Sequence, residues 1–233
     1  MNDAREARMM LRAHRYGALS TLSKKLDGHP FGSITPYLVD HDGSLLIFIS
    51  ALAEHTKNIQ HDPRVSLITH DQNDPHILSQ GRVTVIGNAQ PVQNRDQAGT
   101  IYLRHFPEAL AYFGMHDFSF YRIRPIAIRH IGGFGKIHWI NMEKYAVARA
   151  EQFVQQEESL LAEINAKQQA ILRRLLQQRY GIEAVNVQAI GLDCDGLDVA
   201  SGEHIWRLDF AEAATRPSLD ALVHMEVKVN PGP

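Results

Sequence analysis

Cysteine is almost absent from this sequence, because Cys194 is the only one among 233 residues. An intrachain disulfide and a multi-cysteine metal site both need more than one cysteine, so both are excluded. Long apolar runs are absent as well. No stretch approaches the roughly 20 residues of a membrane span, and residues 1–17 lack the apolar core of a signal peptide. These absences predict a cytoplasmic protein that does not enter a membrane.

The sequence also lacks an excess of charge of one sign. The formal net charge is −2, and the cationic residues are scattered rather than clustered, so nucleic acid is not an expected partner. Apolar residues make up 44% and charged residues 21%, which are ordinary values for a globular chain. Histidine stands out with 13 copies. That number suits metal or haem chemistry, and it equally suits a polar surface.

The first part of the chain reads as a series of short strands. A charged segment at 3–15 predicts a short helix, and strand-like runs with turn-forming residues between them follow. The pair Asp42-Gly43 between two apolar runs is a hairpin signal. Because closing a sheet removes exposed strand edges, the series predicts a closed or half-closed barrel. The expected strands are 18–22, 31–39, 44–51, 64–69, 80–89, 118–123 and 127–131, and the expected helices are 52–62 and 96–113, the second with a break at Pro107.

The spacing of the apolar residues changes from strand-like to helix-like at about Met142. Residues 157–180 carry apolar residues at helical spacing, with Gly181 as a natural C-cap and Asn165 as a potential interruption. Three strand-like runs and a last helix follow. We therefore predict an α+β protein with a barrel domain at 1–144 and a small α/β domain at 145–233. The three runs are 185–192, 197–200 and 205–210, and the last helix is 218–229.

The segment from Ile49 to Leu67 is the first candidate for chemistry. A strand ends in Ser50, and His55 and Lys57 occupy the opening turns of the next helix. Backbone N–H groups at a helix start attract anions, and nearby basic side chains add charge, so this segment could cradle a phosphate. An ordinary surface helix with a polar face has the same spacing.

The same run resembles the pyridoxamine 5'-phosphate oxidase-like, FMN-binding split-barrel family, in which a strand, a polar turn, a basic helix start and Asp-Pro-x-Val-Ser-Leu recur. The resemblance implies a split β-barrel that dimerises and holds its cofactor between two subunits. His55 and Lys57 then fall on the flavin phosphate, Ser50 on the ribityl chain, and Asn58 among the cofactor-binding residues. His55 stands where the oxidases carry a fixed cation, and a neutral imidazole grips phosphate less firmly.

Two further segments, 28–37 (GHPFGSITPY) and 81–87 (GRVTVIG), resemble this family and more closely its haem-utilisation (HugZ/HutZ-like) branch. In a strand, Ser33 and Thr35 share one face and could line a cofactor wall. Arg82 and Thr84 likewise share a face. Two interpretations of Arg82 are open: it binds the cofactor, or it is a strand arginine exposed to solvent. The oxidases place a basic residue where Thr84 stands, which argues against pyridoxamine phosphate as the substrate.

The segments 116–125 (HDFSFYRIRP) and 130–140 (HIGGFGKIHWI) are characteristic of the haem-utilisation branch. Asp117 falls on the aspartate that lies beside the haem in HutZ-like members and tunes its proximal histidine across the subunit interface, so it is our candidate catalytic residue. The glycines that follow allow a flat ring to approach the main chain, or simply form a tight turn. The expected cofactor contacts here are Gly133, Phe134, Gly135 and Lys136.

The resemblance does not identify which residue of this chain would be the axial ligand of the haem iron. In that branch it comes from residues after the barrel, and here no histidine lies between His138 and His204. His138 is the nearest candidate, because imidazole is a normal haem-iron ligand; a packed surface histidine is the alternative. The C-terminal part resembles a small domain that commonly adjoins the barrel. Its usual His-Met-Asn-x-Asp-His element is EINAKQ at 163–168, so both histidines are gone and we interpret that helix as packing.

Three hypotheses follow for the function. The first is a homodimeric haem-handling protein that binds haem at the barrel interface and degrades it oxidatively to release iron. The second is an FMN-dependent oxidoreductase with His55 and Lys57 on the flavin phosphate. The third is a non-enzymatic protein that regulates tetrapyrrole metabolism through a protein partner.

Overall fold

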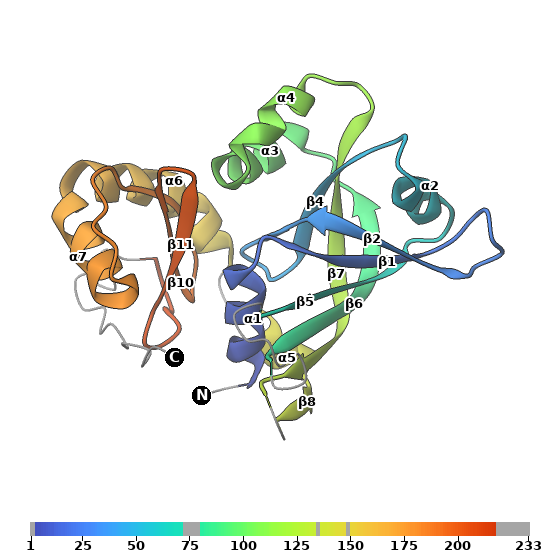
Figure 1. The fold of residues 1–233 in the computed structure, drawn as a ribbon, viewed down its shortest axis with the longest axis horizontal. Coiled ribbons are helices and arrows are strands. Elements are labelled where there is room, and N and C mark those ends of the chain that lie inside the picture. The colour runs from blue at the N-terminus through green and yellow to red at the C-terminus, as the bar shows by residue number, and fades with distance from the viewer. Residues whose placement is uncertain (1–2, 72–79, 134–135, 148–149, 218–233) are drawn as a thin grey trace. The chain divides into compact units, whose positions relative to one another are not determined.

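The computed structural model describes residues 3–71, 80–133, 136–147 and 150–217, and the chain divides into two compact units, Met1–Ala146 and Val147–Pro233. The first unit is built on one curled antiparallel sheet (Figure 1), in the order β2-β1-β5-β6-β7-β4-β3, with β8 added to β7. None of the helices in the described part of the chain is long and apolar enough to cross a membrane. The strands are β1 Tyr16–Leu22, β2 Pro30–Pro36, β3 Leu38–Val39, β4 Leu45–Ser50, β5 Arg64–His70, β6 Arg82–Pro91, β7 Phe118–Ile131 and β8 Ile137–Trp139.

Helices and one 3₁₀ turn connect these strands. The predicted break at Pro107 is confirmed, because the helical region after β6 is divided at Phe106 and Pro107. Proline has no N–H to donate, and its ring clashes with the preceding turn, so the helix ends there. The elements are α1 Asp3–Ala13, α2 Glu54–His61, α3 Arg95–His105, the 3₁₀ turn Pro107–Ala109, α4 Leu110–Phe113 and α5 Met142–Tyr145.

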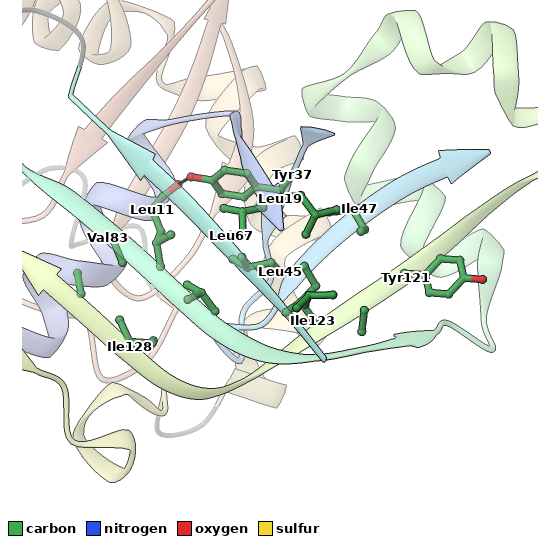
Figure 2. Packing of buried hydrophobic residues seen from close by; sticks show 14 of the residues in the cluster. Leu11, Leu19, Tyr37, Leu45, Ile47, Leu67, Val83, Tyr121, Ile123 and Ile128 are labelled. Atoms are coloured by element: carbon green, nitrogen blue, oxygen red, sulfur yellow. Dashed lines mark hydrogen bonds between the residues drawn. The ribbon is translucent and has the colours of Figure 1, made fainter. Parts of the chain in front are cut away.

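The single strand predicted at 31–39 is wrong, and its division shows how the sheet curls. β2 pairs with β1 and β3 pairs with β4, so two consecutive strands belong to opposite ends of the sheet order. Tyr37 lies between them with 1% of its surface exposed, and its hydroxyl donates to the Leu11 carbonyl at 2.8 Å (Figure 2). The hairpin predicted at Asp42-Gly43 is confirmed between β3 and β4, where Gly43 has a φ of +85° that suits glycine.

Alternation along the strands fills the interior of the barrel. Figure 2 shows the inward-facing side chains of several strands meeting in one cluster, with Leu11 from α1 added to it. Side chains at every second position of a strand share a face, so each strand contributes one apolar row to this core. Leu19, Leu45, Ile47, Leu67 and Ile123 each expose 0% of their surface.

The runs predicted separately at 118–123 and 127–131 form one strand, β7, that continues through Pro125. Pro125 pairs with Gly87 on β6, directly beside a shift in register between Ile86 and Gly87. A proline is tolerated at such a bulge because the ladder hydrogen bond is already interrupted there. β7 therefore runs the whole length of the sheet.

The second unit contains α6 Ala150–Lys167, α7 Gln169–Tyr180 and a three-stranded antiparallel sheet in the order β11-β10-β9. The helix predicted over 157–180 is two helices that part at Gln168, and the C-cap predicted at Gly181 is confirmed by its φ of +69°. The strands are β9 Gln188–Leu192, β10 Gly196–Ser201 and β11 His204–Asp209. The helix expected at 218–229 lies outside the described residues. Together the two units give the predicted α+β fold class.

Candidate functional site

The end of β4 and the start of β7 meet at a hydrogen-bonded pair. The Ser50 hydroxyl donates to Asp117 Oδ2 at 2.7 Å, and the Ala51 N–H donates to the Asp117 carbonyl at 2.6 Å. The Leu52 N–H donates to the Ser50 oxygen at 3.1 Å, which fixes the hydroxyl in place. The structure thus brings together two predicted site residues from segments 67 positions apart. Leu52 and Met115 beside this pair are exposed, at 75% and 46%.

His55 is poorly placed to act as a phosphate-binding cation. Its side chain is partly buried, and its Nε2 atom is buried without a hydrogen-bond partner in the described structure. Burial favours the neutral imidazole and lowers the pKa of His55. Glu54 occupies the first turn of α2, where its carboxylate opposes an incoming anion. Lys57 is exposed and is the cation that this helix start presents to solvent.

Asn58 ties α2 to the sheet. The residue exposes 0% of its surface, its Nδ2 donates to Thr21 Oγ1 at 3.0 Å, and its Oδ1 accepts from the Lys24 N–H at 2.9 Å. Both ends of the amide are therefore used inside the protein. The packing of α2 on β1 accounts for an asparagine at this position.

Ser33 and Thr35 lie on the inward face of β2, where they pair with Leu19 and Gly17 of β1. Thr35 is 2% exposed and its hydroxyl donates to the Pro36 carbonyl at 3.3 Å. The Ser33 hydroxyl is buried and has no hydrogen-bond partner in the described structure. The face shared by these two side chains points into the barrel, and Ile34 between them is 67% exposed on the opposite face.

The opposite face of the sheet carries an unbroken row of cross-strand partners, which we call the outer row. Directly opposed residues on neighbouring antiparallel strands share a face, so these six side chains point outward together. Ile34 and Trp139 at the two ends are 67% and 62% exposed, and Ile68 in the middle is 37% exposed. The outer row consists of Ile34, Ala18, Ile68, Thr84, Arg129 and Trp139.

Two arginines lie close together on this outer face. Arg82 pairs with Ile131 on β7, two positions along the strand from Arg129, so the two side chains are diagonal neighbours. The Arg129 guanidinium carbon lies 5.0 Å from the centre of the Trp139 ring. Sequence reasoning missed Arg129 as a candidate. The alternation of 127, 129 and 131 along the strand was the signal that places it on the same face as Arg82.

The β7–β8 hairpin holds the remaining candidates. Gly133 has a φ of +101°, and the Gly132 N–H donates to the Lys136 carbonyl at 2.9 Å, which closes the turn. Lys136 is exposed, while Phe134 and Gly135 lie outside the described residues. The turn brings Lys136 close to the strand ends that carry the two arginines.

His138 points away from the outer face. It pairs with His130 across the hairpin, and its Nδ1 lies 3.6 Å from Asp3 Oδ2 on α1. His130 is 2% exposed, and burial lowers its pKa, partly offset by the carboxylates of Glu6 and Asp3. Within one subunit, the structure does not bring His138 to the face that carries Arg82.

The candidate residues therefore form two groups within one chain. Ser50, His55, Lys57 and Asp117 lie where β7 begins, whereas Arg82, Arg129 and Lys136 lie where it ends. The strand has 14 residues, so its length along the chain is roughly 45 Å at the usual rise per residue. Figure 1 shows the start of α2 and the β8 hairpin at opposite ends of the sheet. A single subunit does not gather both groups around one ligand.

In the second unit, Asn165 of the altered EINAKQ element has a structural role. Its side-chain amide donates to the Ala189 carbonyl at 2.9 Å and accepts from the Ala189 N–H at 2.7 Å, so it pairs with the edge strand β9.

Elsewhere in this unit the buried Arg207 contacts Asp193 through two hydrogen bonds of 2.7 and 2.8 Å. That arginine supplies positive charge to the buried acidic group Asp193, Cys194 and Asp195.

A curled half-barrel sheet of antiparallel strands around an inward apolar core defines a split-barrel protein. The chain belongs to the CREG β-barrel family, whose model matches residues 1–147. This match confirms the split-barrel resemblance predicted from the motifs. Among curated proteins, the chain is 29% identical over 205 residues to the non-canonical heme oxygenase HOZ, chloroplastic, of Arabidopsis thaliana. The match covers 85% of this chain, which spans 63% of the length of that relative.

Two solved structures resemble nearly the whole chain. A protein of unknown function from Agrobacterium tumefaciens has a TM-score of 0.75 at 25% identity, covering 94% of this chain and 93% of its own. A heme binding protein from Mycobacterium smegmatis has a TM-score of 0.59 at 25% identity, covering 98% of this chain and 96% of its own. Both likenesses extend beyond the barrel into the C-terminal unit.

Proposed function

We propose that this protein binds haem on the outer face of its sheet, at the interface of a homodimer, as a step in haem-iron utilisation. The observation that carries the proposal is the outer row, which places exposed apolar side chains next to Arg129, with Arg82 beside it on the same face. Its support from known proteins is the likeness to a plant protein named as a heme oxygenase and to a mycobacterial heme binding protein.

Haem is a flat apolar ring with two carboxylates on one edge, so its site needs an apolar surface bordered by cations. The outer face offers Ile68 and Ile86, at 37% and 38% exposure, and the indole of Trp139. Arg82 and Arg129 lie beside them. The residues present therefore fit the group. When bound, haem supplies the iron and the macrocycle on which oxygen chemistry depends, and the protein supplies the site and its electrostatics.

FMN is the less favoured cofactor on this scaffold. Its phosphate carries about two negative charges near neutral pH. Of the two basic residues predicted to bind it at the start of α2, only Lys57 is a cation exposed to solvent. The lowered pKa of His55 keeps that imidazole neutral, and the Glu54 carboxylate repels an anion at the helix start. A flavin would therefore lack the fixed cations that hold its phosphate.

The division of the candidate residues supports a homodimer. Asp117 and Arg129 lie at opposite ends of β7, so both can contribute to one site only if they come from different subunits. The exposed Ile34 and Ile68 give a partner sheet an apolar surface to cover. In this arrangement each of the two sites combines the Asp117 end of one subunit with the Arg129 end of the other.

Oxidative haem degradation is the activity that we assign to this site. Ser50 holds the Asp117 carboxylate at 2.7 Å, where it can accept a hydrogen bond from a group beside the haem or polarise that group. His138 faces away from the outer face, so it could be the axial ligand only of a haem bound on the other side of the hairpin. Haem on the outer face predicts an unchanged Soret maximum in His138→Ala. A cytoplasmic location is the expectation from the sequence.

Haem titration with purified full-length protein tests the proposal. We expect a saturable Soret band with one haem per subunit, an apparent dimer in size-exclusion chromatography coupled to light scattering, and no flavin absorption in untreated protein. Adding an electron donor in air should then bleach the Soret band and release iron that a chelator detects. A monomer that takes up no haem would refute the proposal. Haem binding without bleaching or iron release would favour the non-enzymatic regulatory role.

A further inference from the structure

Arg129 differs from the other partly buried arginine of its strand. Arg122, on the same strand, is paired with Asp40 at 2.6 Å between side chains that are 21% and 13% exposed. Arg129 is also partly buried, yet among the described residues its guanidinium contacts only the Trp139 ring, and no carboxylate pairs with it. A guanidinium that has no carboxylate partner in its own chain is available to an anion from outside the chain.

Trp139 fixes the orientation of this guanidinium. The indole is 62% exposed and lies in the outer row directly opposite Arg129, with 5.0 Å between the guanidinium carbon and the ring centre. An arginine over an aromatic face keeps its N–H donors free at the edge of the plane, because the stacking uses the face of the guanidinium. Those donors match the two oxygens of a carboxylate in a bidentate pair.

Arg82 adds a second positive charge on the same face. It is the diagonal neighbour of Arg129, and both flank Thr84 of the outer row. Diagonal neighbours on adjacent strands are close enough for two long side chains to reach one ligand. This juxtaposition suits a ligand with two carboxylates on one edge better than it suits a ligand with a single charge.

We propose that Arg129, oriented by Trp139, binds a carboxylate of the tetrapyrrole and so fixes which edge of the ring enters the site. The inference rests on the proposed haem-binding function and adds a specific residue to it. It predicts that the protein distinguishes haem from a tetrapyrrole whose carboxylates are blocked, and that this distinction depends on Arg129.

The experiment compares haem with haem dimethyl ester, which keeps the ring and the iron but removes both charges. Affinities are measured by absorbance titration with wild type, Arg129→Gln, Arg129→Lys and the control Arg124→Gln. Arg124 is an exposed arginine of the same strand without an aromatic neighbour among the described residues. We expect wild type to bind haem at least tenfold more tightly than the ester. Arg129→Gln should lose most of that preference through weaker haem binding alone, and Arg129→Lys should recover part of it.

The controls separate the outcomes. Unchanged binding of the ester by Arg129→Gln shows that the variant is folded and that the loss concerns the carboxylate. If Arg129→Gln does not fold, the inference is tested by the preference of wild type for haem over the ester and by the change of that preference in Arg129→Lys. Equal wild-type affinity for haem and ester, an unaltered preference in Arg129→Gln, or an equal loss in Arg124→Gln would each overturn the inference while haem binding stands. Wild type that binds neither ligand would overturn the proposed function as well.

Discussion

Replacing Asn58 by alanine separates a structural role for this residue from a cofactor-binding one. The asparagine is fully buried, and its amide joins the Lys24 N–H at 2.9 Å and the Thr21 hydroxyl at 3.0 Å. Alanine removes both hydrogen bonds, of which the one to Thr21 is buried and the one from Lys24 is partly buried, at about 1–2 kcal/mol each. We therefore expect the free energy of unfolding of the barrel unit to fall by about 3 kcal/mol.

The two tryptophans of the chain make this measurement specific for one unit. Trp139 lies in Met1–Ala146 and Trp206 in Val147–Pro233, so Trp206→Phe leaves fluorescence that reports on the barrel alone. In that background, with an m-value of about 2 kcal/mol/M, the urea midpoint of Asn58→Ala should fall by about 1.5 M. Thr21→Val, which removes one of the two bonds, should lower it by about half as much. An unchanged midpoint together with haem binding weakened more than tenfold would refute the structural role.

Three further substitutions or titrations test other parts of the structure. In an NMR titration the His55 ring should have a pKa below 6.5, because burial favours its neutral form. The protein should then lose stability as the pH falls from 6.5 through the pKa of the folded state, because the unfolded chain takes up the proton first. His55→Gln should reduce that loss. Arg207→Met should lower the unfolding free energy of the C-terminal unit in urea by about 3–5 kcal/mol, because it leaves the Asp193 carboxylate buried without its partner. In Gly87→Ala the new Cβ would lie 2.2 Å from the Arg124 carbonyl oxygen, so the bulge must shift, and a thermal melt should show a loss of about 1–3 kcal/mol.

The fold was largely predictable because the local signals agree with the final structure. Alternating apolar residues, the Asp42-Gly43 turn and the Gly181 C-cap each specify their element from neighbouring residues alone. The errors arose where tertiary structure overrides such signals. Pro125 suggested a strand end, but the bulge at Gly87 removes the hydrogen bond that proline would have broken, so β7 continues.

The candidate site was less predictable, because side-chain partners depend on contacts between distant segments. Asn58 lies next to basic residues in sequence, yet its amide faces Thr21 and Lys24 rather than solvent. The pairing of Ser50 with Asp117 spans 67 positions, and no local pattern contains it. Periodicity alone places Arg129 on the outer face, but only the structure shows that no carboxylate of the described chain neutralises it.

The separation of Asp117 from Arg129 along β7 leads to a prediction about the assembly. If each site combines one residue from each subunit, a dimer of one Asp117→Asn chain and one Arg129→Gln chain contains one site with both residues intact and one with both replaced. Random reassociation of equal amounts should then give about one quarter of all sites that both bind haem with wild-type affinity and bleach it, although neither variant has such sites alone. Subunit exchange by mild denaturation, followed by haem titration and the bleaching assay, measures that fraction. If both residues served one site within a single subunit, every chain would carry a defect and mixing would restore nothing.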